Sequence, residues 1–221
     1  MPPLRLDRSL LPTIAALAGV FAIFELTPLD LWVQDRCFDF ATGTWLIDRN
    51  EPVARALFYT GPKVVIGLIG VALIGALARP GGTLRRRDVG VALLTLGGVP
   101  LLVGFGKDTT NVFCPWDITR YGGDVPYVRV LEHFPEGERP ARRGRGFPAG
   151  HASGGFALVG LAGLARTRRA QAAAVALAAV VGGAMGVYQI LKGAHYLSHT
   201  LVTALLAWVL FLLFRRALRA H

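Results

Sequence analysis

The chain has 221 residues, of which 53% are hydrophobic, and its formal net charge is +10. Soluble domains are about 45–50% apolar even when glycine is counted, and here the apolar residues are gathered in long blocks, which excludes an ordinary soluble globular protein. The positive charge is divided among several short connections instead of being gathered on one folded face, which excludes a nucleic-acid-binding surface.

Six apolar blocks follow one another along the chain, each long enough to cross a bilayer as a helix of about 20 residues. Helix is the expected form because lipid cannot satisfy open backbone hydrogen-bonding groups. We therefore predict an all-α integral membrane protein with six transmembrane helices, forming a single domain over residues 1–221. The predicted spans are Leu10–Leu31, Val53–Ala78, Val89–Phe105, Ala149–Ala165, Ala170–Leu191 and Ser198–Leu218.

The first block also has features of a secretory signal peptide, because a basic start precedes an apolar run. However, Glu25 and Pro28 stand where a cleavage site would need small residues. The count of six spans also requires this block, so we predict that it is an uncleaved helix.

Arginines mark one end of every predicted span, and the positive-inside rule places those ends in the cytoplasm. Both termini are then cytoplasmic, and the first, third and fifth connections lie outside. The arginines concerned are Arg5, Arg8, Arg79, Arg85, Arg86, Arg87, Arg166, Arg168, Arg169, Arg215, Arg216 and Arg219. We expect a multi-pass protein of the bacterial inner membrane.

The third connection, roughly Gly106–Pro148, is by far the longest. Connections of more than about 12–15 residues are usually functional or disordered, and the aromatic residues of this one favour an ordered segment with room for a short interfacial helix. Its arginines, Arg142, Arg143 and Arg145 among them, are either a solvated charge run or a surface for anionic headgroups. Cys37 and Cys114 both fall in outer connections, where a disulfide and two unrelated thiols are both possible.

Histidines stand where two of the apolar blocks begin. His151 opens the fourth block, and Pro148 suits the first turn of that helix. His195 lies just before the sixth block, for which Ser198 is the expected N-cap. Helix N-termini bind anions, and two histidines in different environments can serve as nucleophile and acid near neutral pH. This pattern predicts cleavage of a phosphate ester at the membrane surface.

These residues resemble the type 2 phosphatidic acid phosphatase family of membrane lipid phosphatases. That family has three motifs in fixed order: Lys-x6-Arg-Pro, Pro-Ser-Gly-His and Ser-Arg-x5-His-x3-Asp. The chain reads Lys107-x6-Cys114-Pro115, Pro148-Ala149-Gly150-His151 and Tyr188-Gln189-x5-His195-x3-His199. The active-site segments are thus expected at about 107–120, 147–155 and 188–199, facing the periplasm.

The resemblance implies a role for each matching residue. His195 corresponds to the nucleophile that takes the phosphoryl group, His151 to the general acid for the leaving group, and Lys107 to a phosphate ligand. His199 occupies the place of the aspartate that orients the nucleophile, and we count it with the catalytic residues. Neither a cofactor nor a metal is implied.

The chain departs from the family where two arginines are expected. Cys114 and Gln189 cannot reproduce the bidentate phosphate contacts of a guanidinium, and Ala149 replaces a serine. The expected phosphate-binding set is therefore Lys107, Gly150, Gln189, Lys192, Arg120 and Arg145. Glu25, Arg55 and Lys63 are expected to reach the membrane surface with their charged ends, and we assign them no chemistry.

Three other functions remain open at this point. A phosphotransferase of the same fold would pass the phosphoryl group to a lipid acceptor instead of water. A catalytically silent lipid-binding protein would retain the fold without the chemistry. The spacing of His195 and His199 also suits a metal site, although the phosphate motif fits these residues better. The expected partners are the bilayer and a lipid substrate such as undecaprenyl diphosphate, phosphatidic acid, phosphatidylglycerophosphate or lipid A, and the oligomeric state is not predictable.

Overall fold

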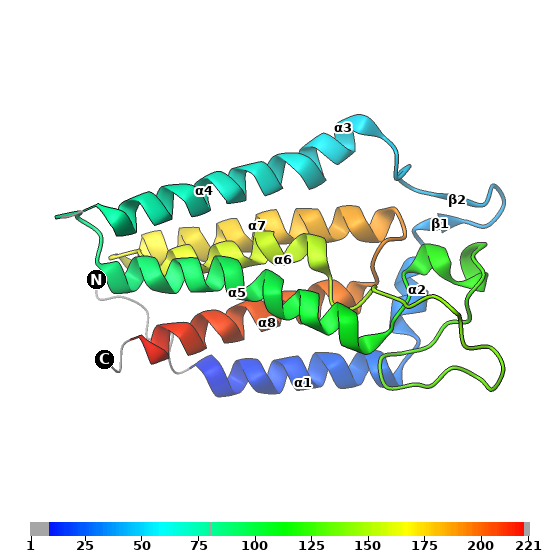
Figure 1. The fold of residues 1–221 in the computed structure, drawn as a ribbon. Helices are drawn as coiled ribbons and strands as arrows, with labels where there is room; N and C mark the ends of the chain where they lie inside the picture. Colours follow the sequence, from blue (N-terminus) through cyan, green and yellow to red (C-terminus); the bar gives the residue numbers. More distant parts are fainter. Residues whose placement is uncertain (1–8, 80, 219–221) are drawn as a thin grey trace.

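The computed structural model describes residues 9–79 and 81–218, and the described chain is mainly helical (Figure 1). Its long helices lie side by side along one axis, and the longest irregular connections gather at one end of the bundle. The principal helices are α1 (Leu10–Leu26), α4 (Gly61–Ala78), α5 (Arg86–Thr110), α6 (Gly150–Ala157), α7 (Arg168–Leu191) and α8 (Leu197–Ala217). The short elements are α2 (Leu29–Gln34), α3 (Pro52–Arg55), the π-helical turn η2 (Ala56–Thr60), and the 3-10 segments η3 (Pro115–Asp117), η4 (Thr119–Tyr121) and η5 (Leu158–Gly163).

Within residues 9–79 and 81–218, four helical segments are long and apolar enough to cross a membrane: Pro52–Ala78, Arg86–Asp117, Arg168–Leu191 and Leu197–Ala217. The other two apolar blocks are also helical, but α1 has only 17 residues, and the fourth block divides into α6 and the 3-10 segment η5. The prediction of an all-helical protein embedded in a membrane is therefore supported. The prediction that all six segments span the bilayer remains a prediction.

The first predicted span, Leu10–Leu31, ends early. Helix α1 stops at Leu26 because Thr27 is extended, with φ −129° and ψ 158°. The residue before a proline is driven out of the helical region by the proline ring, and Pro28 follows here. The chain then turns into the separate helix α2, so Asp30 lies beyond the end of α1.

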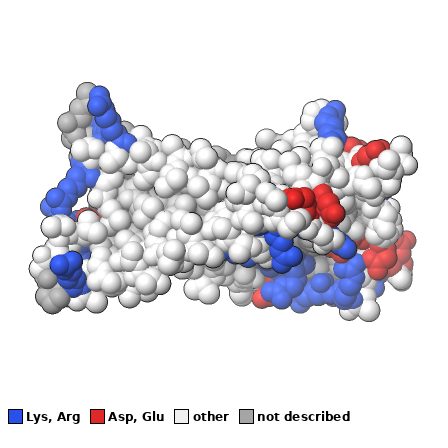
Figure 2. All heavy atoms as spheres, turned by 90° about the horizontal axis from the view of Figure 1, so that it is seen from above, with Lys and Arg blue, Asp and Glu red and all other residues white. Residues whose placement is uncertain are grey.

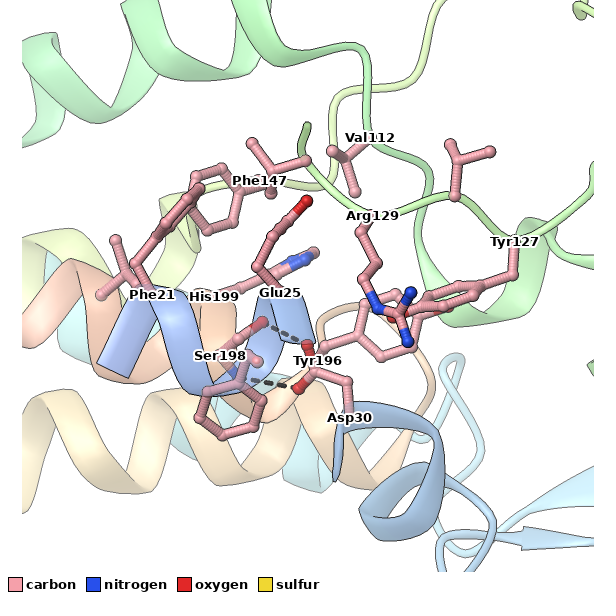
Figure 3. Close-up of a pocket in the computed structure, with 14 residues that line it drawn as sticks. Phe21, Glu25, Asp30, Val112, Tyr127, Arg129, Phe147, Tyr196, Ser198 and His199 are labelled. Carbon is pink, nitrogen blue, oxygen red and sulfur yellow. Dashed lines mark hydrogen bonds between the residues drawn. The ribbon is translucent and has the colours of Figure 1, made fainter. Parts of the chain in front are cut away.

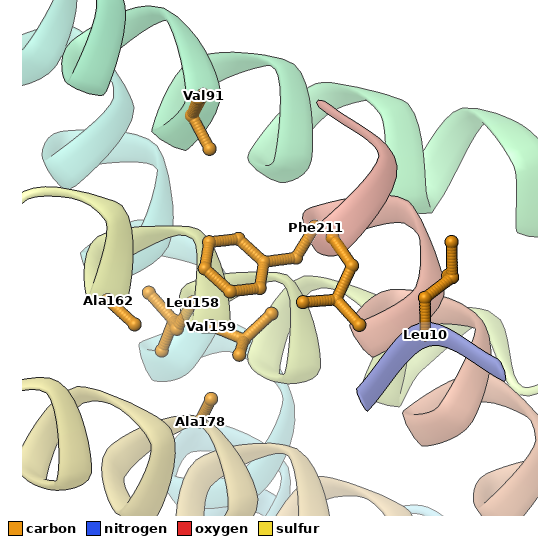
Figure 4. Close-up of a cluster of buried hydrophobic side chains, with 8 residues drawn as sticks. Leu10, Val91, Leu158, Val159, Ala162, Ala178 and Phe211 are labelled. Atoms are coloured by element: carbon orange, nitrogen blue, oxygen red, sulfur yellow. The ribbon is translucent and has the colours of Figure 1, made fainter. Parts of the chain in front are cut away.

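The interior of the bundle is apolar and close-packed. Phe211 of α8 is completely buried and points toward α5 and η5 (Figure 4). Its cluster joins five of the helical segments and comprises Leu10, Val91, Leu158, Val159, Ala162, Ala178, Phe211 and Leu212. This core fixes the relative positions of the helices whose outer ends carry the histidines.

The outer surface of the bundle is also apolar. Only 6% of the most apolar window of Pro52–Ala78 is buried, so the faces of this helix that carry Leu68, Val71 and Ile74 are exposed. Water-soluble monomers rarely expose so continuous an apolar patch. Figure 2 shows the same division, with charged atoms at the two ends and a broad uncharged belt between them.

The two ends of the bundle differ in charge. The end at which α4 stops, α5 and α7 begin and α8 stops carries the arginine-rich segments, whereas the opposite end carries both acids and bases (Figures 1 and 2). This arrangement has the form expected of the positive-inside rule. Arg5, Arg8 and Arg219, which belong to the same prediction, lie outside the described residues.

The third connection is ordered by its own aromatic core. It begins after α5 ends at Thr110, five residues later than predicted, and has two 3-10 turns, η3 and η4, in place of an interfacial α-helix. Its cluster includes residues from the first connection, where β1 (Phe38–Asp39) pairs antiparallel with β2 (Thr44–Trp45). The buried members are Phe38, Phe113, Ile118, Tyr121 and Val125. Cys37 and Cys114 are free thiols.

Candidate active site

His151 lies on the first turn of α6, and the start of that helix is tied to α8. The backbone amide of Ala149, the N-cap residue, donates to Thr203 Oγ1 at 2.9 Å and to the carbonyl of His199 at 3.3 Å. Helix α6 begins at Gly150, so Pro148 precedes the cap and does not occupy the first turn as predicted. The contacts with α8 place two of the histidines at a fixed separation.

His195 is held by the connection between α7 and α8. Helix α7 ends in a turn in which the carbonyl of Gln189 accepts hydrogen bonds from the amides of Ala194, at 2.8 Å, and His195, at 3.3 Å. Gly193 has a positive φ of 73°, a conformation that favours glycine. A β-carbon at this position would lie 2.4 Å from the Trp45 ring, so the close approach also requires glycine.

His199 lies on the first turn of α8, whose cap differs from the prediction. The N-cap residue is Tyr196, and Ser198 lies inside the helix. The amide of Ser198 donates to Asp30 Oδ1 at 2.9 Å, and the Ser198 hydroxyl donates to the other carboxylate oxygen. A carboxylate from α2 thus satisfies the start of α8 from outside, beside His199 and Tyr196 (Figure 3). A cavity of about 20 Å³, with room for about one water molecule, adjoins these residues.

The three histidines form a row. The ring centroids of His151 and His195 are 5.9 Å apart, and the Nδ1 atoms of His195 and His199 are 3.5 Å apart. The Gly146 backbone lies within hydrogen-bonding reach of both His195 and His199. Burial, with Lys107 and the other two histidines nearby, holds the pKa of His195 well below its usual range, so this imidazole is neutral.

Lys107 lies beside the same row. Its Nζ donates to the carbonyl of Arg145 at 2.6 Å, and its charge interacts with His151, His195 and His199. The lysine stem crosses α6 at Gly150, where a β-carbon would lie 2.6 Å from Lys107 Cε. Gly150 therefore contributes by letting the lysine pass. The structure brings Lys107, His151 and His195 together at one end of the bundle.

Gln189 and Cys114 occupy the positions where the family motifs have arginines. The Gln189 side chain is fully buried, and neither its Nε2 nor its Oε1 has a hydrogen-bond partner among the described residues. Buried amides are normally satisfied, so this side chain has free donor capacity. Cys114 lies close enough to Lys107 to interact with it electrostatically, and its amide donates to Asp117.

The two predicted loop arginines are engaged with acids. Arg120 makes hydrogen bonds of 2.8 and 2.7 Å to the two oxygens of Asp35, and Arg145 lies 2.8 Å from Asp108. Among the interactions of the described residues, none joins the Arg120 guanidinium to the histidine row. The prediction that these two arginines bind phosphate is not tested by this arrangement and stays a prediction.

A group of cations lies next to His151, and of its members only Lys192 was predicted as a site residue. The Tyr59 ring of η2 packs against the His151 ring with centroids 4.5 Å apart, and Lys63 Nζ lies 3.8 Å from the Tyr59 centroid. Arg55 and Lys192 also face this ring. The sequence did contain a signal, because Arg55, Tyr59 and Lys63 recur every four residues and so share one helix face.

Asp30 was also missed, and the half-buried Glu25 contacts the third connection at the end of the bundle. Glu25 Oε1 accepts a hydrogen bond of 2.8 Å from the amide of Leu131, in the third connection. In the part of the chain that the structure describes, no group of three or more His, Cys, Asp or Glu side chains is arranged to hold a metal ion. The site instead combines the buried neutral imidazole of His195 with nearby ammonium groups, which suits an anionic substrate.

Comparison with known proteins agrees with this chemistry. Residues 88–221 match the family model described as the PAP2 superfamily. No curated protein and no solved structure gives a significant match. The matched region begins within α5 and contains all three histidines and Lys107.

Proposed function

The chain belongs to the PAP2 superfamily, and we propose that it is a membrane lipid phosphatase that works through a phospho-histidine intermediate. The observation that carries the proposal is the convergence of Lys107, His151 and His195 at one end of an apolar bundle. Phosphoryl transfer depends mainly on positioning and on positive charge around the phosphate oxygens. This end of the molecule has histidines at fixed positions and positively charged side chains beside them.

His195 is the proposed nucleophile. Its Nδ1 faces the Nδ1 of His199 at 3.5 Å, which leaves Nε2 for attack on phosphorus. His199 Nδ1 can accept a hydrogen bond from the Nδ1–H group of His195, as the aspartate of the family motif would. It stabilises a charged His195 less than a carboxylate does, so we expect a slower enzyme.

His151 is the proposed general acid. A group held between nucleophile and acid needs roughly 3 Å on each side, and the 5.9 Å between the two ring centroids is compatible with such a group. As the bond from His195 to phosphorus forms, the phosphorus–oxygen ester bond breaks, and His151 gives its proton to the leaving oxygen. Water then attacks phosphorus, its proton returns to His151, and the bond to His195 breaks.

Lys107 and the Gln189 amide are the proposed phosphate ligands within the family motifs. Lys107 supplies a full charge, and Gln189 Nε2 is a buried donor with no other partner among the described residues. No metal enters this scheme, so we expect the activity to survive a chelator.

We place the site on the periplasmic face of a bacterial inner membrane. The arginine-rich end of the bundle, which we assign to the cytoplasm, lies opposite the histidines (Figures 1 and 2). All six helical segments are proposed to span the bilayer, with the third connection outside. The substrate is a lipid phosphate or diphosphate whose headgroup reaches this surface.

The test is phosphate release by the purified protein in detergent–lipid micelles. The panel contains phosphatidic acid, phosphatidylglycerophosphate, undecaprenyl diphosphate and lipid A. We expect release from at least one lipid, its loss in His195→Ala and His151→Ala, and its retention in His133→Ala, which removes an exposed histidine of the third connection. A wild-type protein that is as inert as His195→Ala on every lipid would refute the proposal, and label passing to a second lipid would indicate a transferase.

A further inference from the structure

Tyr59 lies at the centre of a second group of cations beside His151. The Tyr59 ring contacts the His151 ring at a centroid distance of 4.5 Å. Lys63 Nζ lies 3.8 Å from the Tyr59 centroid, and Lys192 Nζ and Arg55 Cζ each lie 5.6 Å from it. All three fall within the range of a cation–π interaction with Tyr59, and Lys192 Nζ lies closer still to the Tyr188 ring, at 4.4 Å from its centroid.

This cation group lies on the side of His151 that is remote from the nucleophile. His195 interacts electrostatically with Lys107 and His151, whereas His151 also interacts with Lys63 and Lys192. Lys107 therefore serves the phosphoryl group that is transferred. Lys63 and Lys192 lie where the leaving group must be, because His151 is the acid that protonates it.

These cations differ from Arg120, Arg142 and Arg145, each of which is paired with an acid. In the described part of the chain, no ion pair joins Arg55, Lys63 or Lys192 to an acid. Burial, followed by the charges of Arg55 and Lys63, lowers the pKa of Lys192 to about 8. Lys63 also stands within a predicted membrane span, where ionisable side chains are rare and usually functional. An anionic ligand accounts for a group of this composition.

We propose that Arg55, Lys63 and Lys192 form a second phosphate subsite and that the substrate is a lipid diphosphate. This inference rests on the proposed phosphatase function and specifies its substrate class. The terminal phosphate would lie between His195 and Lys107, and the lipid-linked phosphate between His151 and the Tyr59 cations. A leaving group that is itself a phosphate needs positive charge beyond the general acid, whereas a lipid alcohol does not.

The reaction at this subsite is balanced without a further reagent. The bond from His195 to the terminal phosphorus forms as the bond from that phosphorus to the bridging oxygen breaks. The bridging oxygen departs with the lipid-linked phosphate and takes the proton of His151. The negative charge that develops there is met by Lys63 and the guanidinium of Arg55, which can bind two phosphate oxygens at once.

An apolar groove lies on the membrane-facing surface and includes residues of η2 and α4, the segments that also carry Tyr59 and Lys63. It has a volume of about 360 Å³ and is lined by apolar residues of η2, α4, η5 and α7, among them Leu57, Ile66 and Leu177. Leu57 belongs to the same π-helical turn as Tyr59, so one wall of the groove is formed by the segment that carries the cation group. The occupant that we assign to it is the hydrocarbon tail of the diphosphate substrate.

The experiment compares farnesyl diphosphate with farnesyl monophosphate, which share one tail, in mixed micelles. We expect wild-type protein to prefer the diphosphate in kcat/KM. In Lys63→Met and Arg55→Met the ratio of the two kcat/KM values should fall roughly tenfold or more, the effect of one hydrogen bond to a charged group. Lys63→Arg should restore most of the ratio, because it keeps the charge. Arg49→Met is the matched control, since Arg49 lies over Trp116 instead of Tyr59.

The outcomes separate the two proposals. If wild-type protein hydrolyses farnesyl monophosphate equally well, or if Lys63→Met and Arg55→Met depress both substrates alike, the second subsite is refuted while the phosphatase stands. If wild-type protein acts on neither of these substrates nor on the lipid panel, both proposals fail. Thermal unfolding of each variant identifies a loss of activity that comes from misfolding.

Discussion

The carboxyl group of Asp30 should make the stability of this protein depend on pH. Asp30 is 5% exposed, and its partner Ser198 is the second residue of α8, next to His199. Burial raises the pKa of this carboxyl from 3.8 to about 6, although hydrogen bonds from Ser198 partly oppose the rise. The charged form therefore costs free energy in the folded protein.

The sign and size of the effect follow from that pKa. Because the folded protein holds the Asp30 proton more tightly than the unfolded chain, this group stabilises the fold below pH 3.8, and that contribution is lost as the pH rises through 6. A difference of about 2 pH units corresponds to about 3 kcal/mol. For a chain of about 150–250 residues this is roughly 6–12 °C in thermal midpoint.

The variant Asp30→Asn isolates the contribution of Asp30 titration to stability, because asparagine keeps an acceptor for the Ser198 amide and does not titrate. We expect the midpoint of Asp30→Asn, relative to wild type, to rise by up to about 10 °C between pH 4 and pH 7. Asp30→Ala is the matched variant. It leaves a buried amide without its acceptor, at a cost of about 1–3 kcal/mol at every pH.

The measurement is thermal unfolding in detergent, followed by circular dichroism at pH 4, 5, 6 and 7. A constant difference between wild type and Asp30→Asn over this range would show that Asp30 does not titrate between the folded and unfolded states as argued. It would then follow that the start of α8 is open to water and that the His199 environment is less enclosed than described.

Two further predictions concern phosphate binding. Burial lowers the pKa of Lys192 to about 8, so kcat/KM for a lipid phosphate should fall as the pH rises through 8. Lys192→Arg should abolish that fall, because arginine stays charged. A pH profile that the substitution leaves unchanged would exclude Lys192 from the site. Gly150→Ala should raise KM roughly tenfold, because its β-carbon would lie 2.6 Å from Lys107 Cε and displace the lysine. Gly154→Ala, whose β-carbon would meet only Ile66 at 3.5 Å, is the control on the same helix, and equal KM values in both variants would contradict this role.

Much of the fold was predictable because the apolar blocks and arginine positions depend on local composition. The six helical segments appear in the predicted order, and the three motif histidines meet as the family resemblance implied. The boundaries were less predictable. The end of α1 is set by Pro28, and the start of α8 by Asp30, a residue 168 positions from its partner Ser198. The sequence of α8 alone contains no pattern that predicts this contact.

The site was predictable only where its residues belong to the family motifs. Arg55 and Lys63 were assigned to the membrane surface because single charges near span ends usually reach water. Their proximity to His151 depends on how α4 packs against α6, which sequence periodicity does not determine. The spacing of Arg55, Tyr59 and Lys63 on one helix face was the available signal. It could be interpreted only with knowledge of the helix that packs against this face.

The substitutions at the two arginine positions and the cations around Tyr59 have a common electrostatic explanation. An arginine at position 189 would have to be fully buried, and an arginine at position 114 would add positive charge within electrostatic reach of Lys107. A protein that draws its cations from Arg55, Lys63 and Lys192 instead keeps two of them, Arg55 and Lys63, exposed, where an incoming headgroup would neutralise them, while Lys192 is buried. If the second phosphate subsite is correct, the positive charge lies on the leaving-group side of the histidine row, where the lipid-linked phosphate of the substrate would bind.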